Sequence, residues 1–402
     1  MLSKSSFPLL LLNMFLAMLS TGLVIPILPE LLREFGAGGQ AAGYLVSCFG
    51  LTQFIFSPIA GNLSDKYGRK PMIIVGLFLF ALSNLIAAVA SDLSLLFVSR
   101  LIGGIGSAAL VPSIMAYVAD ITTNEQRGKA MSLLGTSMTS GFIIGPGAGG
   151  LLAEFGLRTP FYASVGIGLL AMLCSLKFLP ESLTVEQQMK QRESKVKKEN
   201  VLRQLALSIK SPYFVLLLMV FALTFGLMQF EAIFPLFVVQ SYGFTTRDIA
   251  ILLTVCSLIA TFNQLVLTGK LTRWLGEKKV ISLMMLLCAV SLVCLLLSGN
   301  FIYVMILTML FFTFNNILRP TINTLLSKEA GDEQGFVAGL NNAYMSLGNI
   351  FGPGLAGILF DFHMNLPYLF GALVLILSSI VAAKRIGKKS AYYKKQSASV
   401  SS

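Results

Sequence analysis

The sequence predicts an all-α integral membrane protein of twelve transmembrane helices, arranged as two pseudo-symmetric six-helix bundles. Three observations predict this fold. Apolar stretches long enough to cross a bilayer recur from end to end, Lys and Arg gather in alternate connecting segments, and the second half repeats the first at a nearly constant offset.

The composition excludes a water-soluble globule. The chain has 402 residues, of which 55% are hydrophobic and only 12% are charged, and its mean hydropathy is +0.79. Soluble domains carry roughly 25% charged residues. The apolar stretches are continuous, whereas a membrane β-barrel alternates apolar and polar residues over about ten positions, so a barrel is excluded as well.

A helix needs about 20 apolar residues to cross the hydrocarbon core, and this length predicts twelve spans. The first apolar stretch is too long for a signal-peptide core and lacks a small-residue cleavage site, so we expect it to be a retained helix. The predicted spans are 8–32, 42–62, 71–90, 93–120, 129–154, 160–179, 212–240, 247–268, 279–298, 301–327, 336–360 and 367–386.

The positions of the cations orient the chain. With a cytoplasmic N-terminus, the cytoplasmic segments carry 25 of the 30 Lys and Arg residues, and the outer loops carry only Arg33, Arg158 and Arg247. This asymmetry predicts that both termini are cytoplasmic. The net charge of +12 therefore belongs to loops beside the lipid bilayer, and nucleic acid is excluded as a partner.

The two halves repeat each other in one register. Each half contains six spans, so the repeats are parallel, an arrangement in which the binding site lies near the membrane midplane between the halves. The matches at an offset of 208 are Gly61 to Gly68 with Gly269 to Gly276, Pro112 with Pro320, and Gln126 with Gln334; Gly145-Pro146 and Gly352-Pro353 match at 207.

The repeat and the charge pattern divide the chain into four parts. Residues 1–180 form the N-terminal six-helix bundle, and 211–386 form the C-terminal one. The polar, Lys-rich and Gln-rich segment 181–210 is predicted to be a cytoplasmic linker, and 387–402 a basic cytoplasmic tail.

The loop after the second span has glycines at fixed intervals around a carboxylate. It reads Gly61-Asn-Leu-Ser-Asp65-Lys-Tyr-Gly68-Arg69-Lys-Pro and resembles the signature loop of the major facilitator superfamily. We expect the glycines to allow a tight turn and close helix approach, Asp65 to meet a cation or a helix N-terminus, and Arg69 to hold the loop inside. An ordinary positive-inside loop explains the cations but not this spacing.

The fifth span contains small residues one turn apart, followed by a proline. The run Gly141-Phe-Ile-Ile-Gly145-Pro146-Gly-Ala-Gly149 is similar to a motif of the drug-antiporter branch of the superfamily. Small residues at this spacing let backbones approach, and proline loosens a helix. Generic packing explains the same pattern, and Ser132 stands where the longer motif has glycine, so antiport is favoured but left open here.

Arg100 lies near the middle of the fourth span, where an arginine costs roughly 3 kcal/mol unless a partner or water receives it. The surrounding Arg100-Leu-Ile-Gly-Gly-Ile-Gly resembles another superfamily motif, with Gly103 in place of its Gln. We expect Arg100 to face an aqueous cavity; the alternative is that it snorkels to the outer surface.

Across nearly its whole length the chain resembles Gram-positive multidrug exporters of the NorA and Bmr type, most closely around Arg319-Pro320 and from Gly331 to Gly357. The resemblance implies export of lipophilic cations and fluoroquinolone-like drugs in exchange for protons. We further expect a monomer in the bacterial cytoplasmic membrane. A major facilitator transporter of one metabolite remains the alternative, because fold does not set function.

Glu231 is the acidic residue placed deepest within a span. Its helical neighbours at three and four residues, among them Phe234 and Pro235, are apolar or aromatic, so loss of hydration favours the neutral carboxyl. One carboxyl that takes either a proton or a cationic drug is the simplest chemistry of antiport. The resemblance carries the same role to Glu231. A structural Glu paired with Lys or Arg is the alternative.

The tenth span carries Asn316, Arg319 and Asn323 on one face, which we expect to face the substrate cavity. The similar exporters have an acid at the position of Asn316, so its absence puts a second protonation site in doubt. Phe234, one turn from Glu231, is the aromatic residue we expect to contact a cationic drug.

The sequence lacks the residues that nucleotide binding, metal binding or enzymatic catalysis would need. The sequence contains no nucleotide-binding Gly-Lys-Ser/Thr loop, its five Cys lie inside apolar segments without metal-ligand spacing, and its one His, His363, falls in a predicted outer loop. We therefore expect no catalytic residue, cofactor or metal, and an ion gradient as the source of energy.

Overall fold

The computed structural model describes residues 6–193, 201–209, 211–331 and 333–385, and all regular elements in these ranges are helices. The predicted basic tail, 387–402, lies outside them. Eleven helical segments among the described residues are long and apolar enough to cross a membrane. The all-α membrane fold predicted from the sequence is confirmed.

The first span is interrupted by its prolines. It consists of α1 (Ser6–Val24), a single 3-10 turn η1 (Ile25–Ile27) and α2 (Leu28–Glu34), and together these form one candidate span. Pro26 and Pro29 lack a backbone N–H; Pro26 lies in the 3-10 turn η1, and Pro29 lies in the first turn of α2. The predicted single helix is therefore a helix with a break near its far end.

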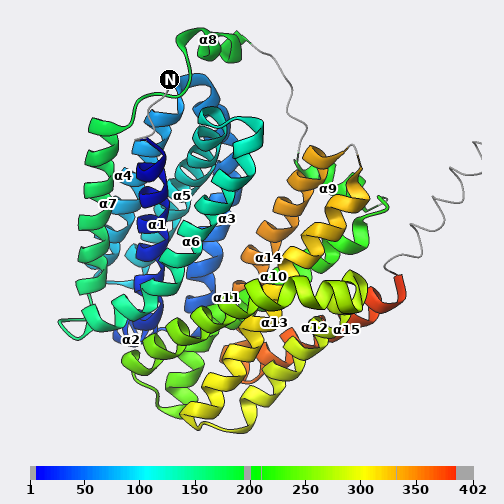
Figure 1. Ribbon diagram of the computed structural model, residues 1–402. Helices are drawn as coiled ribbons and strands as arrows, with labels where there is room; N and C mark the ends of the chain where they lie inside the picture. Colours follow the sequence, from blue (N-terminus) through cyan, green and yellow to red (C-terminus); the bar gives the residue numbers. More distant parts are fainter. Residues whose placement is uncertain (1–5, 194–200, 210, 332, 386–402) are drawn as a thin grey trace, which may run out of the picture. The chain divides into compact units, whose positions relative to one another are not determined.

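The rest of the first six-helix half consists of long single helices (Figure 1). They are α3 (Gly39–Tyr67), α4 (Arg69–Ala88), α5 (Leu93–Ile121), α6 (Asn124–Ala153) and α7 (Thr159–Phe178).

The predicted linker contains two short helices, α8 (Val185–Glu193) and α9 (Val201–Ser208). The second half follows with α10 (Phe214–Tyr242), α11 (Thr246–Leu275), α12 (Glu277–Cys294) continued by η2 (Leu295–Leu297), α13 (Phe301–Ala330), α14 (Gln334–Phe362) and α15 (Leu366–Arg385).

The predicted span 129–154 corresponds to α6, which is not among the eleven apolar candidates. At 30 residues it is about 45 Å long and could cross a bilayer by length. Gly, Ser and Thr make up 12 of its residues, and these lower its hydropathy. Its small side chains serve instead to bring α6 close to α1, as described below.

The chain divides into two compact units. The first contains Met1–Lys197 together with Phe244–Thr254, and the second contains Lys198–Gly243 together with Val255–Ser402. The first turns of α11 thus group with the first unit, whereas the sequence repeat assigns α11 to the second half. The division at 181–210 is retained as a proposal based on the repeat.

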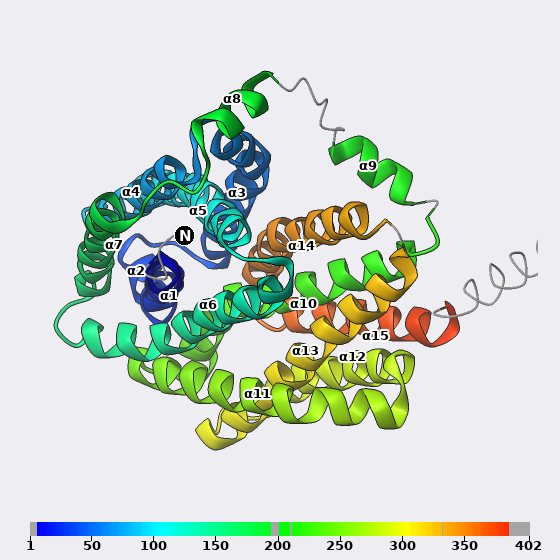
Figure 2. The same cartoon turned by 45° about the horizontal axis from the view of Figure 1, so that its top comes forward.

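In the first unit, α1 packs along α6 and α7, and α5 packs against α3 and α4; Figure 2 shows these helices from a second direction. Leu10 and Met14 of α1, Ile73 of α4 and Tyr117 of α5 meet in a core from which water is excluded. Burying such side chains contributes about 1.5 to 3 kcal/mol each in water; within a bilayer, close packing takes over much of this role.

In the second unit, α10 contacts α13, α14 and α15, and α12 contacts α13 and α15. Phe230 of α10 lies at the centre of an aromatic cluster. Its ring stacks on Phe234 at 4.5 Å between centroids and contacts Phe311 at 4.7 Å and Tyr368 at 6.2 Å. The rings hold three helices together.

The repeat extends to local geometry. Asp92 Oδ1 accepts a hydrogen bond from Leu95 N (3.0 Å) at the start of α5, and Asn300 Oδ1 accepts one from Ile302 N (3.0 Å) at the start of α13. These N-caps are 208 residues apart, the offset found in the sequence. Equivalent spans therefore begin in the same way.

Candidate functional site

Glu231 is a half-buried carboxyl near the middle of α10. The cation that acts on it electrostatically is Arg319 of α13, although the two do not come within ion-pair distance. Arg319 Nη2 donates a hydrogen bond to Met345 Sδ of α14 at 3.5 Å. The second unit thus places a carboxyl and a guanidinium on two neighbouring helices, where they interact electrostatically without forming an ion pair.

The polar stripe of α13 is accessible along its length. Asn316 is half-buried, whereas Arg319 and Asn323 are exposed. Asn341 of α14 donates to Met345 Sδ (3.8 Å), and its buried Oδ1 has no hydrogen-bond partner among the described residues. The face around Arg319 therefore has polar groups with spare hydrogen-bonding capacity. That this stripe faces the substrate path stays a prediction.

Phe234 is fully buried (0% exposed) in the aromatic cluster of the second unit. Its ring is covered by Phe230 and lies in the core of the bundle. A direct contact with a drug would require the ring to leave this stack, so Phe234 can act in this structure only by supporting the helix that carries Glu231. Its role as a drug contact stays a prediction.

Arg100 of α5 is half-buried and makes no hydrogen bond or ion pair with any other described residue. Close helix packing holds the segment that follows it. A Cβ on Gly103 would lie 2.7 Å from Ser83 Oγ, and one on Gly104 would lie 2.4 Å from the carbonyl oxygen of Phe49. The glycines of this motif hence let α5 approach α3 and α4 closely, and that contact fixes the helix from which Arg100 projects.

The glycines around Pro146 form a backbone-to-backbone contact between α6 and α1. A Cβ on Gly145 would lie 2.6 Å from Gly22 Cα, one on Gly141 would lie 2.3 Å from Phe15 O, and one on Gly149 would lie 2.1 Å from Leu23 O. Real Cβ atoms do not approach so closely, so each of these positions requires glycine while the helices stay in place.

The signature loop is a tight connection between α3 and α4 made by one glycine. Gly68 has φ +108° and ψ 157°, a conformation that L side chains rarely adopt. A Cβ there would also come within 2.7 Å of the Glu181 carboxyl carbon. Gly61, in contrast, has open space where a Cβ would lie, so the expected close approach is found at Gly68 and not at Gly61.

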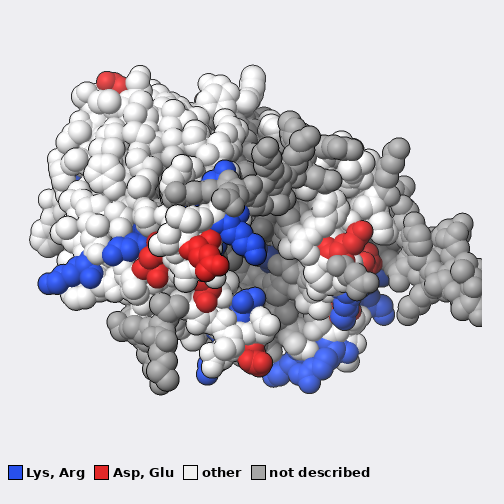
Figure 3. All heavy atoms as spheres, turned by 90° about the horizontal axis from the view of Figure 1, so that it is seen from above, with Lys and Arg blue, Asp and Glu red and all other residues white. Residues whose placement is uncertain are grey.

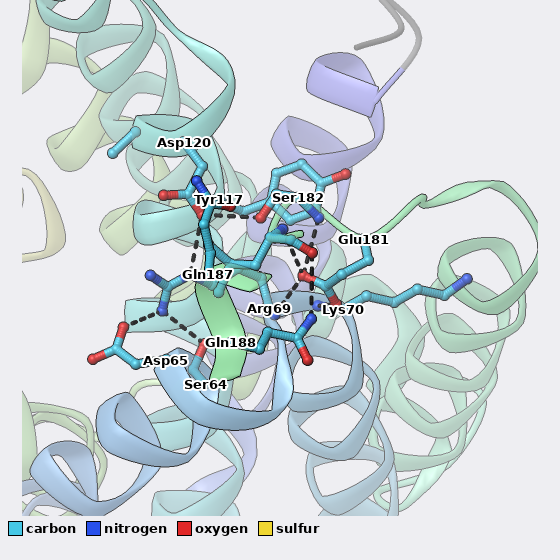
Figure 4. Close-up of polar contacts among 12 residues, drawn as sticks. Ser64, Asp65, Arg69, Lys70, Tyr117, Asp120, Glu181, Ser182, Gln187 and Gln188 are labelled. Atoms are coloured by element: carbon cyan, nitrogen blue, oxygen red, sulfur yellow. Dashed lines mark hydrogen bonds and ion pairs between the residues drawn. The ribbon is translucent and has the colours of Figure 1, made fainter. Parts of the chain in front are cut away.

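Arg69 links three helices at the end of the first unit that adjoins the linker (Figure 4). Its guanidinium donates to Asp65 Oδ1 of α3 at 2.6 Å and to Asp120 Oδ2 of α5 at 3.1 Å. The Arg69 side chain is only 11% exposed, which strengthens both ion pairs relative to surface pairs. The cation that the sequence predicts opposite Asp65 is therefore Arg69, four residues later in the chain.

A helix N-terminus is also part of this cluster, but its anion is Glu181 and not Asp65. Glu181 Oε1 accepts from Arg69 N at 2.8 Å, and Oε2 accepts from Lys70 N at 3.0 Å. The carboxylate thus satisfies two backbone donors of the first turn of α4 and complements its dipole. Ser182 Oγ donates to Asp120 Oδ2 at 2.9 Å beside it.

Sequence reasoning missed Glu181 because it treated the residues after Pro180 as linker. The available signal is the short polar run Pro180-Glu181-Ser182 directly after a span. In the structure this run is fastened at both ends, since Tyr117 OH donates to Pro180 O at 2.6 Å. The start of the linker is thus fixed to the first unit.

Replacing Glu181 by Gln should weaken this attachment. Glutamine keeps one acceptor and loses the charge, so we expect a loss of about 1 kcal/mol in stability and faster cleavage of the linker in limited proteolysis. The control is Glu186→Gln, since Glu186 is exposed in the same segment. Equal cleavage rates in the two variants would contradict the role assigned to Glu181.

The second unit carries the same arrangement with opposite charges. Gly276, 208 residues after Gly68, also has positive φ (76°). Glu277 of α12 forms an ion pair with Lys328 of α13, at the positions equivalent to Arg69 and Asp120. Each half therefore has an ion pair between its equivalent helices, but the sign of each partner is reversed.

A second polar contact in the second unit joins the residue before α10 to the residue before α14. Tyr213 OH, just before α10, donates to Glu333 Oε2, just before α14, at 3.1 Å. Burial, together with this hydrogen bond, raises the pKa of Tyr213 to about 12. The phenol therefore stays protonated and remains a donor throughout the physiological pH range.

The described residues contain no group of three or more His, Cys, Asp and Glu side chains arranged to hold a metal ion. The site residues described above supply one carboxyl in the middle of a span, a guanidinium on a neighbouring helix, and two ion-paired clusters at helix ends. Such a set can bind and release protons and cations and can fix helix positions.

Comparison with known proteins identifies the family of the chain. The sequence profile described as Major Facilitator Superfamily matches residues 10–353 and 267–401. Multidrug resistance protein 2 of Bacillus subtilis (strain 168) is 44% identical over 374 residues, 93% of each chain. Quinolone resistance protein NorA of Staphylococcus aureus (strain COL) is 33% identical over 372 residues, 92% of this chain and 93% of that protein.

Solved structures show the same fold at low sequence identity. A bacterial homologue of the human lysosomal transporter Spinster, inward-facing and occupied, has a TM-score of 0.76 with 15% identity, over 95% of this chain and 96% of the other. A mutant of the nucleoside transporter NupG has a TM-score of 0.75 with 15% identity, over 94% and 98%. The chain therefore belongs to the major facilitator superfamily and is a multi-pass membrane transporter, not an enzyme.

Proposed function

We propose that this protein exports amphipathic and cationic drugs from the bacterial cytoplasm in exchange for protons, by alternating access. The observation that carries the proposal is Glu231. Its carboxyl is half-buried in the middle of a membrane helix and interacts electrostatically with Arg319. The names of the similar multidrug and quinolone resistance proteins support drugs as the substrate class.

The exchange rests on one carboxyl that holds one partner at a time. A protonated Glu231 is neutral and lets a cationic drug leave, whereas an ionised Glu231 attracts the cation. Arg319 adds a positive charge on the neighbouring helix α13. Protons moving down their gradient supply about 2.3 kcal/mol per charge per 100 mV of potential.

The cation distribution supports an orientation with both termini and the linker in the cytoplasm. The ion-paired clusters around Arg69 and Glu277 would then lie at the cytoplasmic ends of their helices. We propose that they hold those helix ends together while the protein alternates, and that it does so as a monomer.

Inverted membrane vesicles energised by a proton gradient test the function. We expect them to accumulate ethidium and norfloxacin, with uptake abolished by a protonophore and absent from vesicles that lack the protein. Uptake of neither compound by vesicles that contain folded protein would refute drug export and favour the alternative, a superfamily transporter of one metabolite.

A further inference from the structure

The connection between α11 and α12 is strongly basic. Its cations lie on both sides of the turn at Gly276, and its one acid, Glu277, is paired with Lys328 of α13. We call residues 270–279 the basic turn; its cations are Lys270, Arg273, Lys278 and Lys279. Figure 3 shows one face of the molecule on which Lys and Arg gather, with Asp and Glu among them.

The equivalent turn of the first half is nearly neutral. Residues 62–71 with Asp120 contain three cations and two carboxylates, a net charge of +1, whereas the basic turn with Lys328 contains five cations and one carboxylate, a net charge of +4. Glu181 adds a further carboxylate to the first cluster. No Asp or Glu follows Asp361 in the sequence, so the second half has no counterpart of Glu181. The basic turn therefore has a larger excess of positive charge than the equivalent turn of the first half.

Trp274, the single tryptophan of the chain, lies within the basic turn and is 83% exposed. Next to it, Arg273 is also exposed, and its Nε donates to Gly269 O at 3.0 Å. Two turns or more back along α11, Leu265 and Phe262 are exposed by 79% and 65%. A tryptophan between apolar side chains and cations is typical of the level where lipid headgroups meet acyl chains.

We propose that the basic turn binds the headgroup of an anionic phospholipid. Lys270, Lys278 and Lys279 supply the charge that attracts the phosphate, and Trp274 lies at the boundary between headgroup and acyl chain. The lipid phosphate would take the place that carboxylates occupy in the first half. This inference does not depend on drug export or on proton coupling.

The single tryptophan makes the site directly measurable. In vesicles of phosphatidylcholine with a fixed fraction of brominated lipid, bromine on the acyl chains quenches a nearby indole. We expect brominated phosphatidylglycerol to quench Trp274 about twofold more strongly than the same fraction of brominated phosphatidylcholine, because the cations enrich the anionic lipid around the turn. Equal quenching by the two lipids would overturn the proposal.

Two variants distinguish a lipid site at the basic turn from general attraction of anionic lipid to a positively charged protein. In K270Q/K278Q/K279Q, which keeps Trp274 and the Glu277–Lys328 pair, the ratio of quenching should fall to about one. In W274F/Y67W, the indole is moved to Tyr67, which is 56% exposed at the nearly neutral turn, and the ratio should again be about one. An unchanged ratio in either folded variant would contradict a site at the basic turn.

Discussion

Replacing Glu231 by Gln is expected to abolish proton-coupled drug transport, with uptake in energised vesicles falling to the level of vesicles without the protein. Glutamine has nearly the same shape and stays neutral, so it mimics the protonated carboxyl permanently. The half-buried position beside the aromatic cluster favours a neutral side chain. The protein should therefore fold normally and lose only the exchange of proton for cation.

Proton release offers a second readout for this variant. Addition of a cationic drug to the purified native protein in weak buffer should release protons, and Glu231→Gln should release none. Glu329→Gln is the matched control, because Glu329 is also half-buried in the second unit but lies at the end of α13. Coupled transport that persists in Glu231→Gln would remove this residue from the mechanism.

Replacing Gly149 by Ala should both destabilise the protein and stop transport. The added methyl group would lie 2.1 Å from the carbonyl oxygen of Leu23, and a backbone atom cannot move aside as a side chain end can. Helices α1 and α6 must separate, which we expect to lower stability by about 3 kcal/mol. Thermal unfolding in detergent measures the loss, and vesicle uptake measures the activity.

Gly135→Ala provides the control on the same helix. Gly135 has open space at the Cβ position, so alanine should raise stability slightly, by about 0.5 kcal/mol, through its better helix propensity. If both variants unfolded at the same temperature, the contact between α1 and α6 would not be the reason for the glycines around Pro146.

The sequence predicted the features that depend on local pattern. Apolar stretches located the helices, and the intervals around Gly68 located a turn that needs positive φ. Glu181 was missed because its partners, the N–H groups of Arg69 and Lys70, lie more than 100 residues earlier in the chain. Pairings at that separation are set by the packing of helices, which a single sequence does not display.

The same limit applies to which side of a helix faces inward. Helix α10 is apolar on nearly all sides, so its pattern does not distinguish a buried ring from an accessible one, and only the structure shows Phe234 inside the stack. In helix α6 the glycines lower the hydropathy, so composition alone does not mark it as a membrane span. The same glycines make its close contact with α1 possible.

The reversed ion pairs of the two halves have a consequence for how each half can change. Asp120→Lys alone would set a lysine against Arg69, and Lys328→Glu alone would set a carboxylate against Glu277. Either substitution converts an attraction into a repulsion beneath a tight glycine turn. Complementarity within each pair is therefore the constrained property, and in the first half a change of sign at Arg69 would have to be matched at both Asp120 and Asp65.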